Sequence, residues 1–385
     1  MSKPVIGIMV WRNGRTLSEP AYFRGLVREG QKLGAVTYLF TLTDIEDRKK
    51  KINGLTLSPE GEWQEREFGW PDVVIDRYRR GGSLYTGIRN SSLFVYANNK
   101  FTNKWTATQL FLREDRLKRW MPETLEYNHY NLRRMLNRHS LLYIKPGNGT
   151  AGSSIVKLKV LSNGYEVLGR SRNLTRRKAV LPSSSSLRNW LDQWTVKERI
   201  HNGNFMVQQG LDLELVPGRV VDTRLLIQKN EKGVWEVTGL GMRVGAPRSS
   251  TSNLHGGGKA LPFHVLLHKR FGKTRTESIR QECEELAQEV VRTIERHFGS
   301  MMEFGLDIGI DVDGKVWLIE VNPKPGREIF REMGDKTLYR KAVRRPLEYA
   351  VHLAQALAKT SAALDEEALE PKSAGEPDED AEVES

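Results

Sequence analysis

Residues 305–321 have the pattern of a half-buried β-hairpin that carries acidic side chains, and this segment constrains the fold most. Two apolar runs flank an Asp-Gly turn; Asp307 lies on the first run, whereas Glu320 and Asn322 project from one face of the second. Unpaired acids are costly in a half-buried sheet, and carboxylate and amide oxygens suit Mg²⁺. We therefore predict a metal site at Asp307, Glu320 and Asn322, the alternative being a solvated acidic face.

A second segment has the composition of a phosphate-binding loop. A predicted strand at 141–144 leads into Lys145, and residues 146–154 contain three glycines and three hydroxyl residues. Glycine-rich backbone can turn its N–H groups toward phosphate oxygens, and a lysine adds a positive charge. Because the lysine precedes the glycines, the segment is not a Walker A motif. The remaining alternatives are a phosphate loop and an ordinary hairpin turn.

Two arginines in adjacent predicted strands are further candidates. Arg224 shares strand parity with Asp222, and Arg243 lies in the next strand. A planar guanidinium can hold a γ-phosphate or a substrate carboxylate, although a single strand arginine is more often surface charge.

The order of predicted elements indicates an α/β protein with several units. A strand–helix–strand opening (5–10, 19–33, 36–42) and strands at 72–76 and 93–96 predict a small α/β domain over 1–100. A second α/β unit is expected over 101–204 and a third over 205–362, followed by a disordered acidic tail at 363–385. In the third unit, a helix at 276–298 places Cys283 on its apolar face as a core residue.

Composition excludes several classes of protein. The single cysteine excludes an internal disulfide framework, and no apolar run approaches the ~18 residues of a membrane span. The opening residues lack the features of a signal peptide, so we expect a soluble protein made in the cytoplasm, with no membrane partner.

The formal net charge of +12 conceals an asymmetry. Residues 364–385 hold ten acids against one lysine, so the rest of the chain carries +21 and should attract polyanions. Nucleic acid is the weaker alternative because no recognised binding motif accompanies the charge. The acidic tail could screen this surface when no anion is bound.

Taken in order, these parts resemble the ATP-grasp superfamily over residues 101–330, and more closely the YheC/YheD family of endospore coat-associated proteins. The phrases that carry the resemblance are Tyr143-Ile-Lys-Pro-Gly, Val207-Gln-Gln-Gly-Leu, Asp222-Thr-Arg, and Phe304-Gly-Leu-Asp through Glu320-Val-Asn-Pro-Lys-Pro-Gly. The resemblance implies an α/β (α+β) ATP-grasp fold, with a small N-terminal domain, a central domain that carries a lid, and a C-terminal domain that binds ATP and Mg²⁺.

The resemblance also implies roles for individual residues. Lys104 and Lys145 would contact the ATP phosphates beneath a lid formed by Gly147, Gly149, Gly152 and Ser153. A hinge would meet adenine through Gln208, Gln209, Gly210, Leu211 and Asp212. The magnesium ligands would be Asp307, Glu320 and Asn322, while Arg224, Arg243 and Asn253 would face the γ-phosphate and the acceptor carboxylate. Gln208 and Gln209 are neutral where relatives carry a glutamate, so the residue that reads the nucleotide is left open.

The implied function is an ATP-dependent ligase that joins a carboxylate to an amine or similar nucleophile through an acylphosphate, in association with the spore coat. Its substrate would be a small or polymeric carboxylate, and its partners coat proteins or an anionic polymer. The alternative is a non-catalytic ATP-binding protein with a structural or regulatory role in the coat.

Overall fold

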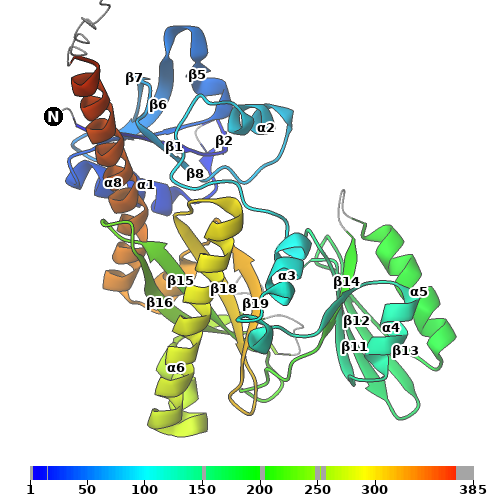
Figure 1. Ribbon diagram of the computed structural model, residues 1–385. Coiled ribbons are helices and arrows are strands. Elements are labelled where there is room, and N and C mark those ends of the chain that lie inside the picture. The colour runs from blue at the N-terminus through cyan, green and yellow to red at the C-terminus, as the bar shows by residue number, and fades with distance from the viewer. Residues whose placement is uncertain are drawn as a thin grey trace, which may run out of the picture.

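The structure of the protein is a computed structural model, which describes residues 3–14, 16–149, 153–199, 204–247, 252 and 257–369. Three large sheets, each with its own helices, confirm the predicted α/β class (Figure 1). No helix in this described part of the chain combines the length and apolar character needed to cross a membrane.

The N-terminal unit is built on parallel strands. β1 (Val5–Met9) lies between β4 (Val36–Phe40) and β8 (Val73–Asp76), and α1 (Pro20–Lys32) connects the first pair as predicted. The strand predicted at 93–96 is wrong, because this segment meets the sheet only through a single bridge between Tyr96 and Val74. A hairpin of β6 (Lys51–Leu57) and β7 (Trp63–Gly69) was not predicted. The smaller elements are β2 (Arg12–Asn13), β3 (Thr16–Leu17), β5 (Ile45–Glu46), α2 (Ser83–Asn90) and 3₁₀ turns at Leu42–Asp44 and Asp47–Lys49.

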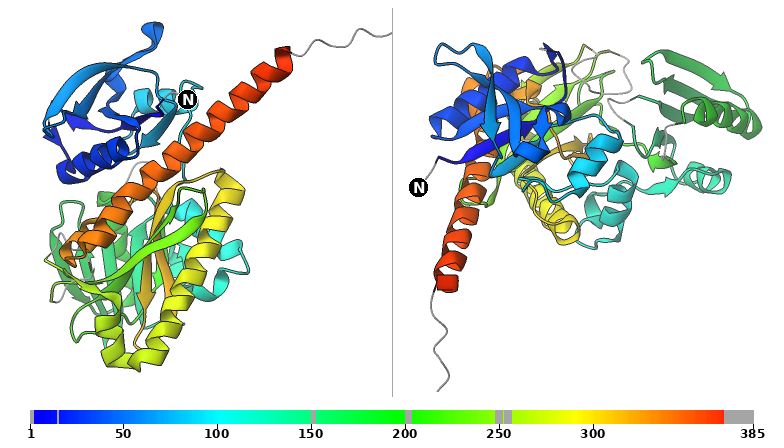
Figure 2. Two further views of the ribbon diagram at one scale, coloured as in Figure 1. Left: turned by 90° about the vertical axis from the view of Figure 1, so that its left-hand side faces the viewer. Right: turned by 90° about the horizontal axis from the view of Figure 1, so that it is seen from above.

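The long C-terminal helix completes this first unit. α8 (Lys336–Leu369) packs along α1, and Val343, Leu347 and Ala350 are buried in the same core as β1 and β4 (Figure 2). The helix also contacts the C-terminal sheet. It runs into the range expected as a disordered tail, and the rest of that range, 370–385, lies outside the described residues. The N-terminal unit is therefore not made by residues 1–100 alone.

The central unit is a six-stranded antiparallel sheet with helices on one face. Its order is β13-β12-β11-β10-β14-β9, and Leu187 and Leu191 of α5 are buried against it. Ser183 caps α5, since its hydroxyl accepts a hydrogen bond from the Ser186 N–H. The strands are β9 (Thr124–Glu126), β10 (Leu141–Pro146), β11 (Ile155–Leu161), β12 (Gly164–Arg170), β13 (Arg176–Leu181) and β14 (Phe205–Gln209), and the helices are α4 (His129–Leu136) and α5 (Ser184–Lys197). β14, which the sequence reading placed in the third unit, belongs to this sheet.

The C-terminal unit is a five-stranded antiparallel sheet with the predicted acidic hairpin at its edge. Its order is β17-β16-β15-β18-β19, from β15 (Val221–Lys229), β16 (Trp235–Val244), β17 (Lys259–Pro262), β18 (Glu303–Ile310) and β19 (Val316–Asn322). α6 (Phe263–Phe298) covers this sheet and buries Cys283, as predicted; it starts earlier than expected and kinks at Gly272. α3 (Lys104–Arg113), the 3₁₀ turn Lys118–Trp120 and α7 (Glu328–Glu332) complete the described elements.

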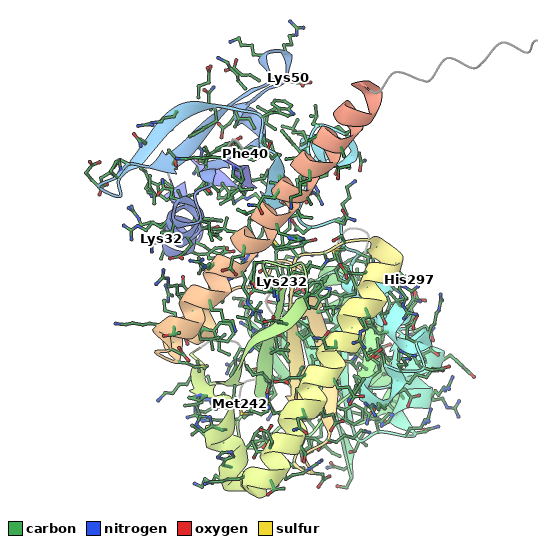
Figure 3. The ribbon with its side chains drawn as sticks, turned by 60° about the vertical axis from the view of Figure 1, so that its left-hand side comes forward. Lys32, Phe40, Lys50, Lys232, Met242 and His297 are labelled. Carbon is green, nitrogen blue, oxygen red and sulfur yellow. The ribbon has the colours of Figure 1, made fainter. Side chains whose placement is uncertain are left out.

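Side chains divide between these cores and the surface as the strand pattern requires. Phe40 in the N-terminal unit and Met242 in the C-terminal sheet are fully buried, whereas Lys32 and Lys50 lie at the surface (Figure 3). Each unit therefore has its own core, and the surfaces between the units are left for a site.

Candidate functional site

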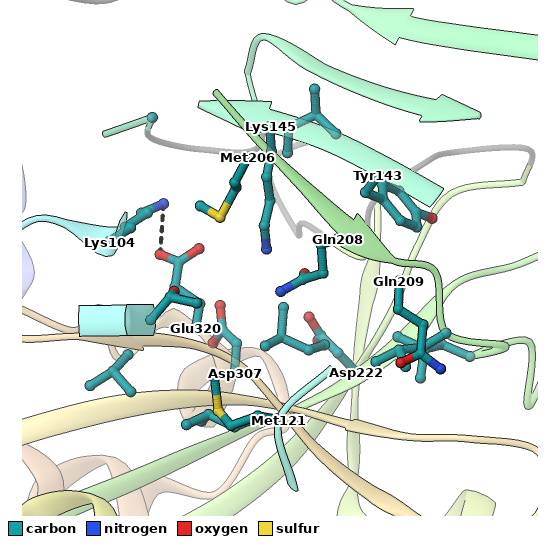
Figure 4. A pocket seen from close by; sticks show the side chains of 18 of the residues that line it. Lys104, Met121, Tyr143, Lys145, Met206, Gln208, Gln209, Asp222, Asp307 and Glu320 are labelled. Carbon is teal, nitrogen blue, oxygen red and sulfur yellow. Dashed lines mark ion pairs between the residues drawn. The ribbon is translucent and has the colours of Figure 1, made fainter. Parts of the chain in front are cut away.

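A cavity lies between the central sheet and the C-terminal sheet, and most predicted site residues line it (Figure 4). They come from α3, β10, β14, β16, β18 and β19, and from the loops next to them. The predicted residues in its wall are Lys104, Lys145, Gly149, Ser153, Gln208, Gln209, Leu211, Arg243, Asp307 and Glu320. Residues distant in the sequence thus converge on one place.

Strand alternation on β10 turns Lys145 into the cavity. Leu142 and Ile144 are buried beneath the helices of the central unit, so Tyr143 and Lys145 project from the opposite face. Burial lowers the pKa of Lys145 to about 8; Glu320 opposes this shift and Lys104 adds to it. Burial therefore makes the charged form of the Lys145 amine less favourable than it is in water. A bound anion would stabilise that charged form.

Lys104 enters the cavity from the first turn of α3. Asn103 caps this helix by accepting a hydrogen bond of 2.9 Å from the Thr106 N–H. The Lys104 Nζ lies 2.8 Å from Glu320 Oε1, the ion pair drawn in Figure 4. Lys104, which was expected to contact phosphate, therefore forms an ion pair with Glu320 in this structure.

The glycine loop is tied to α3 at its start. The Gly147 N–H donates to the Asn204 carbonyl at 2.7 Å, and the Gly147 carbonyl accepts from the Trp105 N–H at 3.0 Å. A Cβ at Gly147 would lie 2.7 Å from the Trp105 Cβ, so only glycine fits without a shift. Gly152 lies outside the described residues. Because Trp105 follows Lys104, the loop and this lysine are positioned together.

The far end of the loop is anchored by a buried acid. Ser154 is fully buried with φ of 59°, and its hydroxyl donates to Glu198 Oε2 at 2.9 Å. The same Glu198 oxygen accepts from the Arg172 N–H at 2.6 Å. Both ends of the glycine loop are therefore fixed, whereas Gly149 and Ser153 between them face the cavity.

The hairpin brings its two carboxylates together as predicted. Asp307 and Glu320 are direct cross-strand partners, and a bulge follows Asp307. Asp307 Oδ1 accepts from Arg224 Nε at 2.6 Å, and Asp307 Oδ2 lies 3.1 Å from Arg243 Nη2. Burial favours the neutral acid, but the two arginines outweigh it and hold the pKa of Asp307 at about 2. Asp307 is consequently ionised at any physiological pH.

The two arginines are held by acids in this structure. Arg243 forms a fork with Asp222, at 2.7 and 2.6 Å, in addition to its contact with Asp307. Arg243 lines the cavity as expected for a phosphate or carboxylate ligand, but Arg224 is not among the described lining residues. Arg224 orients Asp307 from within the sheet. Asn253, the third residue expected here, lies outside the described part of the chain.

Two of the three predicted magnesium ligands on the hairpin, Asp307 and Glu320, line the cavity, whereas Asn322 does not. Asp307 and Glu320 provide hard oxygen ligands at the cavity wall, whereas Asn322 pairs with Gly305 and is not among the lining residues that the structure describes. Among the described residues, no group of three or more His, Cys, Asp and Glu side chains could hold a metal on its own. The two carboxylates therefore fit an ion that takes its remaining ligands from phosphate oxygens and water, as Mg²⁺ commonly does.

The balance of charges among the residues that line the cavity also suits a bound Mg²⁺ ion. Its cations Lys104, Lys145 and Arg243 are matched in number by the acids Asp222, Asp307 and Glu320. A bound triphosphate would leave the cavity strongly negative unless a metal ion came with it.

The hinge differs in part from expectation. The Gln208 amide donates to Thr124 Oγ1 at 2.7 Å, and Gln209 Oε1 accepts from the Glu123 N–H at 3.2 Å. A Cβ at Gly210 would lie 2.3 Å from the Leu141 side chain, which explains the glycine. Asp212 is exposed, accepts from the Glu214 N–H and is not a lining residue, so it does not serve the cavity here.

Sequence reasoning missed the apolar wall. Tyr143, Ile155, Met206 and Leu318 line the cavity beside the charged residues, together with Met121. Strand parity could have indicated two of them, because Tyr143 shares a face with Lys145 and Met206 shares one with Gln208. Such a slot suits a flat, largely apolar ring.

The chain is similar in sequence and fold to several known proteins. A family model described as YheC/D like ATP-grasp matches residues 94–353. Over 368 residues the chain is 27% identical to the endospore coat-associated protein YheD of Bacillus subtilis (strain 168), covering 91% of this chain and 79% of that protein. The endospore coat-associated protein YheC of the same strain is 22% identical over 322 residues, covering 80% of this chain and 86% of that protein. The D-alanine-D-alanine ligase from Coxiella burnetii has the same fold at 12% identity, with a TM-score of 0.52 over 94% of this chain and 99% of that one.

Proposed function

The chain belongs to the YheC/D-like ATP-grasp family, and we propose that it binds ATP with Mg²⁺ in the cavity and uses it to join a carboxylate to an amine or similar nucleophile. The observation that carries the proposal is the convergence of Lys104, Lys145, Asp307 and Glu320 on one cavity with an apolar slot beside them. Phosphate-binding cations, metal-binding acids and a ring-sized slot are the parts that nucleotide chemistry requires.

The positions of the residues support a role for each of them in this reaction. Lys145 and Lys104 neutralise phosphate oxygens. For this, Lys104 must give up its ion pair with Glu320. A substrate carboxylate attacks the γ-phosphorus; the bond to the ADP oxygen breaks and an acylphosphate forms. The amine then attacks the acyl carbon and releases phosphate. Arg243 lies where it can hold the transferred phosphoryl group or the carboxylate.

Asp307 and Glu320 would hold the metal, which supplies neutralisation of the charge that develops on the phosphates. Arg224 keeps Asp307 in place for this task through its 2.6 Å contact.

The test is release of ADP by the full chain in the presence of carboxylate and amine pairs. We expect Lys145→Ala and Glu320→Ala to lower the substrate-stimulated rate by about 10²–10³-fold while the far-UV circular dichroism is retained. Lys341→Ala, at an exposed position on α8, is the matched control and should keep the parent rate. ADP release that is unchanged in both cavity variants would contradict the proposal.

A second candidate rests on the names of the relatives, both described as endospore coat-associated. The chain would then bind ATP as a structural or regulatory coat component without turnover. This function predicts a nucleotide-dependent rise in melting temperature with no substrate-stimulated ADP release. Under either function we propose an association with the spore coat, which immunogold labelling of spore sections with tagged protein would test.

A further inference from the structure

The cavity-facing side of the central sheet continues outward as a row of cations. Lys145 shares this face with Lys157 and Lys159 of β11, with Arg170 of β12, and with Arg176 and Lys178 of β13. The register places Lys157 opposite Leu168 and Leu168 opposite Lys178, and it places Ile155 opposite Arg170 and Arg170 opposite Arg176. The other face of the same strands buries Val156, Leu158 and Val167 against the helices.

The charge on this face is not balanced within the sheet. Glu166 is the single acid that β11, β12 and β13 place on it, and it pairs with Lys178 at 2.6 Å. Arg170 and Arg176 are direct cross-strand neighbours, and like charges in that position destabilise a sheet. Burial and the neighbouring Arg176 lower the pKa of Arg170. A bound anion would reduce the repulsion between these two arginines.

The face is accessible and reaches the cavity. Lys159, Arg176 and Lys178 are exposed, and Lys157 and Arg170 are half-buried. β13 forms the outer edge of the central unit, away from α8 (Figure 1). At the inner end, Ile155 lies in the cavity wall, so the row from Arg176 through Arg170 leads directly to the nucleotide site.

The chemistry of the face favours a carboxylate polymer over nucleic acid. Proteins that bind single-stranded nucleic acid offer exposed aromatic rings on which bases stack. On β10 to β13 the one aromatic side chain of this face is Tyr143, which lines the cavity, while Tyr165 packs against the core on the opposite face. Arginine forks and lysines without rings suit a flexible chain of carboxylates.

We propose that this face of β11, β12 and β13 binds an acidic peptide and directs one of its carboxylates to the cavity. The second half of this statement rests on the proposed ligase function; binding of the peptide does not. Five of the cations that contribute to the +21 charge of the chain outside residues 364–385 thereby gain a specific role.

The test measures binding of a fluorescein-labelled deca-glutamate peptide to the full chain by anisotropy, without nucleotide. Arg170→Gln/Arg176→Gln should weaken binding at least tenfold. The matched control is Lys336→Gln/Lys341→Gln, which removes the same charge from another basic surface on α8 and should change binding less than twofold. Equal weakening by both double variants, or none by the first, would overturn the proposal.

Further measurements separate the outcomes. The nucleotide-dependent melting shift of Arg170→Gln/Arg176→Gln should equal that of the parent, which shows an intact fold and cavity; if that variant fails to fold, Lys159→Gln/Lys178→Gln at exposed positions takes its place. A labelled thymidine decanucleotide that binds this face more tightly than the peptide would overturn the assignment to carboxylates. Peptide binding that depends on the arginines, without any stimulated ADP release, would refute the ligase function and leave the surface proposal standing.

Discussion

The lowered pKa of Lys145 makes anion binding in the cavity dependent on pH. The same burial that lowers its pKa to about 8 makes its charged form costly in the free protein. A bound phosphate would favour the charged form and raise the pKa again. Above pH 8 the free protein has lost this proton and must regain it on binding, whereas below pH 8 it already holds the proton.

Nucleotide affinity should therefore be nearly constant from pH 7 to 8 and fall above pH 8, by up to about tenfold per pH unit. Isothermal titration with an ATP analogue in buffers of different ionisation enthalpy would measure both the affinity and the proton uptake. Lys145→Arg is the control, because an arginine stays protonated over this range and should give a flat profile. A fall of equal size in Lys145→Arg would assign the pH dependence to another group.

At the scale of the element, the glycine loop and α3 are held together by a backbone hydrogen bond. The Gly147 carbonyl accepts from the Trp105 N–H at 3.0 Å, and this contact fixes the loop beside the turn that presents Lys104. The loop end at Ser154 is held by Glu198 in the central unit. The position of Lys104 thus depends on backbone contacts as well as on its own side chain.

Gly147→Ala should disturb the contact between the glycine loop and α3 while the fold is retained. Its Cβ would meet the Trp105 Cβ at 2.7 Å and the Asn204 carbonyl oxygen at 3.0 Å, so loop and helix must separate, at a cost of about 1–3 kcal/mol. We expect a smaller nucleotide-dependent melting shift by differential scanning fluorimetry. Gly87→Ala in α2, where a Cβ meets no atom within 4 Å, should leave the shift unchanged. An undiminished shift in Gly147→Ala would show that the loop and Lys104 are independent.

The elements that sequence reasoning could predict are those with a clear period. The hairpin of β18 and β19 has two apolar runs around an Asp-Gly turn. Asp307 and Glu320 were expected on its two strands, and the structure makes them cross-strand partners. β13 was missed because Arg176, Arg177 and Lys178 carry no apolar alternation. The ion pairs of the site could not be predicted, since Arg224 and Asp307 are 83 residues apart and meet only through the pairing of β15 with β18.

At the scale of the whole molecule, buried charges and one helix join the ends of the chain. Glu303 of the C-terminal sheet contacts Arg77 at the end of β8, at 3.2 Å, and also pairs with Arg327. Both guanidinium groups lie over the ring of Tyr22 in α1. Breaking a buried ion pair is strongly destabilising, so we expect this cluster to favour one arrangement of the N-terminal unit on the C-terminal one.

α8 also joins the N-terminal unit to the C-terminal unit, because it contacts both. Its residues Val343, Leu347, Tyr349, Ala350 and Ala354 are buried in the core of the N-terminal unit. Each large apolar side chain contributes roughly 1.5–3 kcal/mol on burial, so their sum approaches the whole stability of a typical domain, about 5–15 kcal/mol. The first hundred residues therefore lack part of the core that they need.

We predict that a chain ending at Asp335 loses the fold of its N-terminal unit. In hydrogen exchange measured by mass spectrometry, β1 and β4 should lose protection, whereas β10 and β14, which belong to the separate core of the central unit, should keep it. The control is a chain ending at Leu369, which keeps α8 complete and should match the full chain. Since the N-terminal unit is held by a helix that follows every described residue of the cavity wall in the sequence, it can complete its fold only after those residues have been synthesised. Protected β1 and β4 in the shorter chain would show instead that this unit is autonomous.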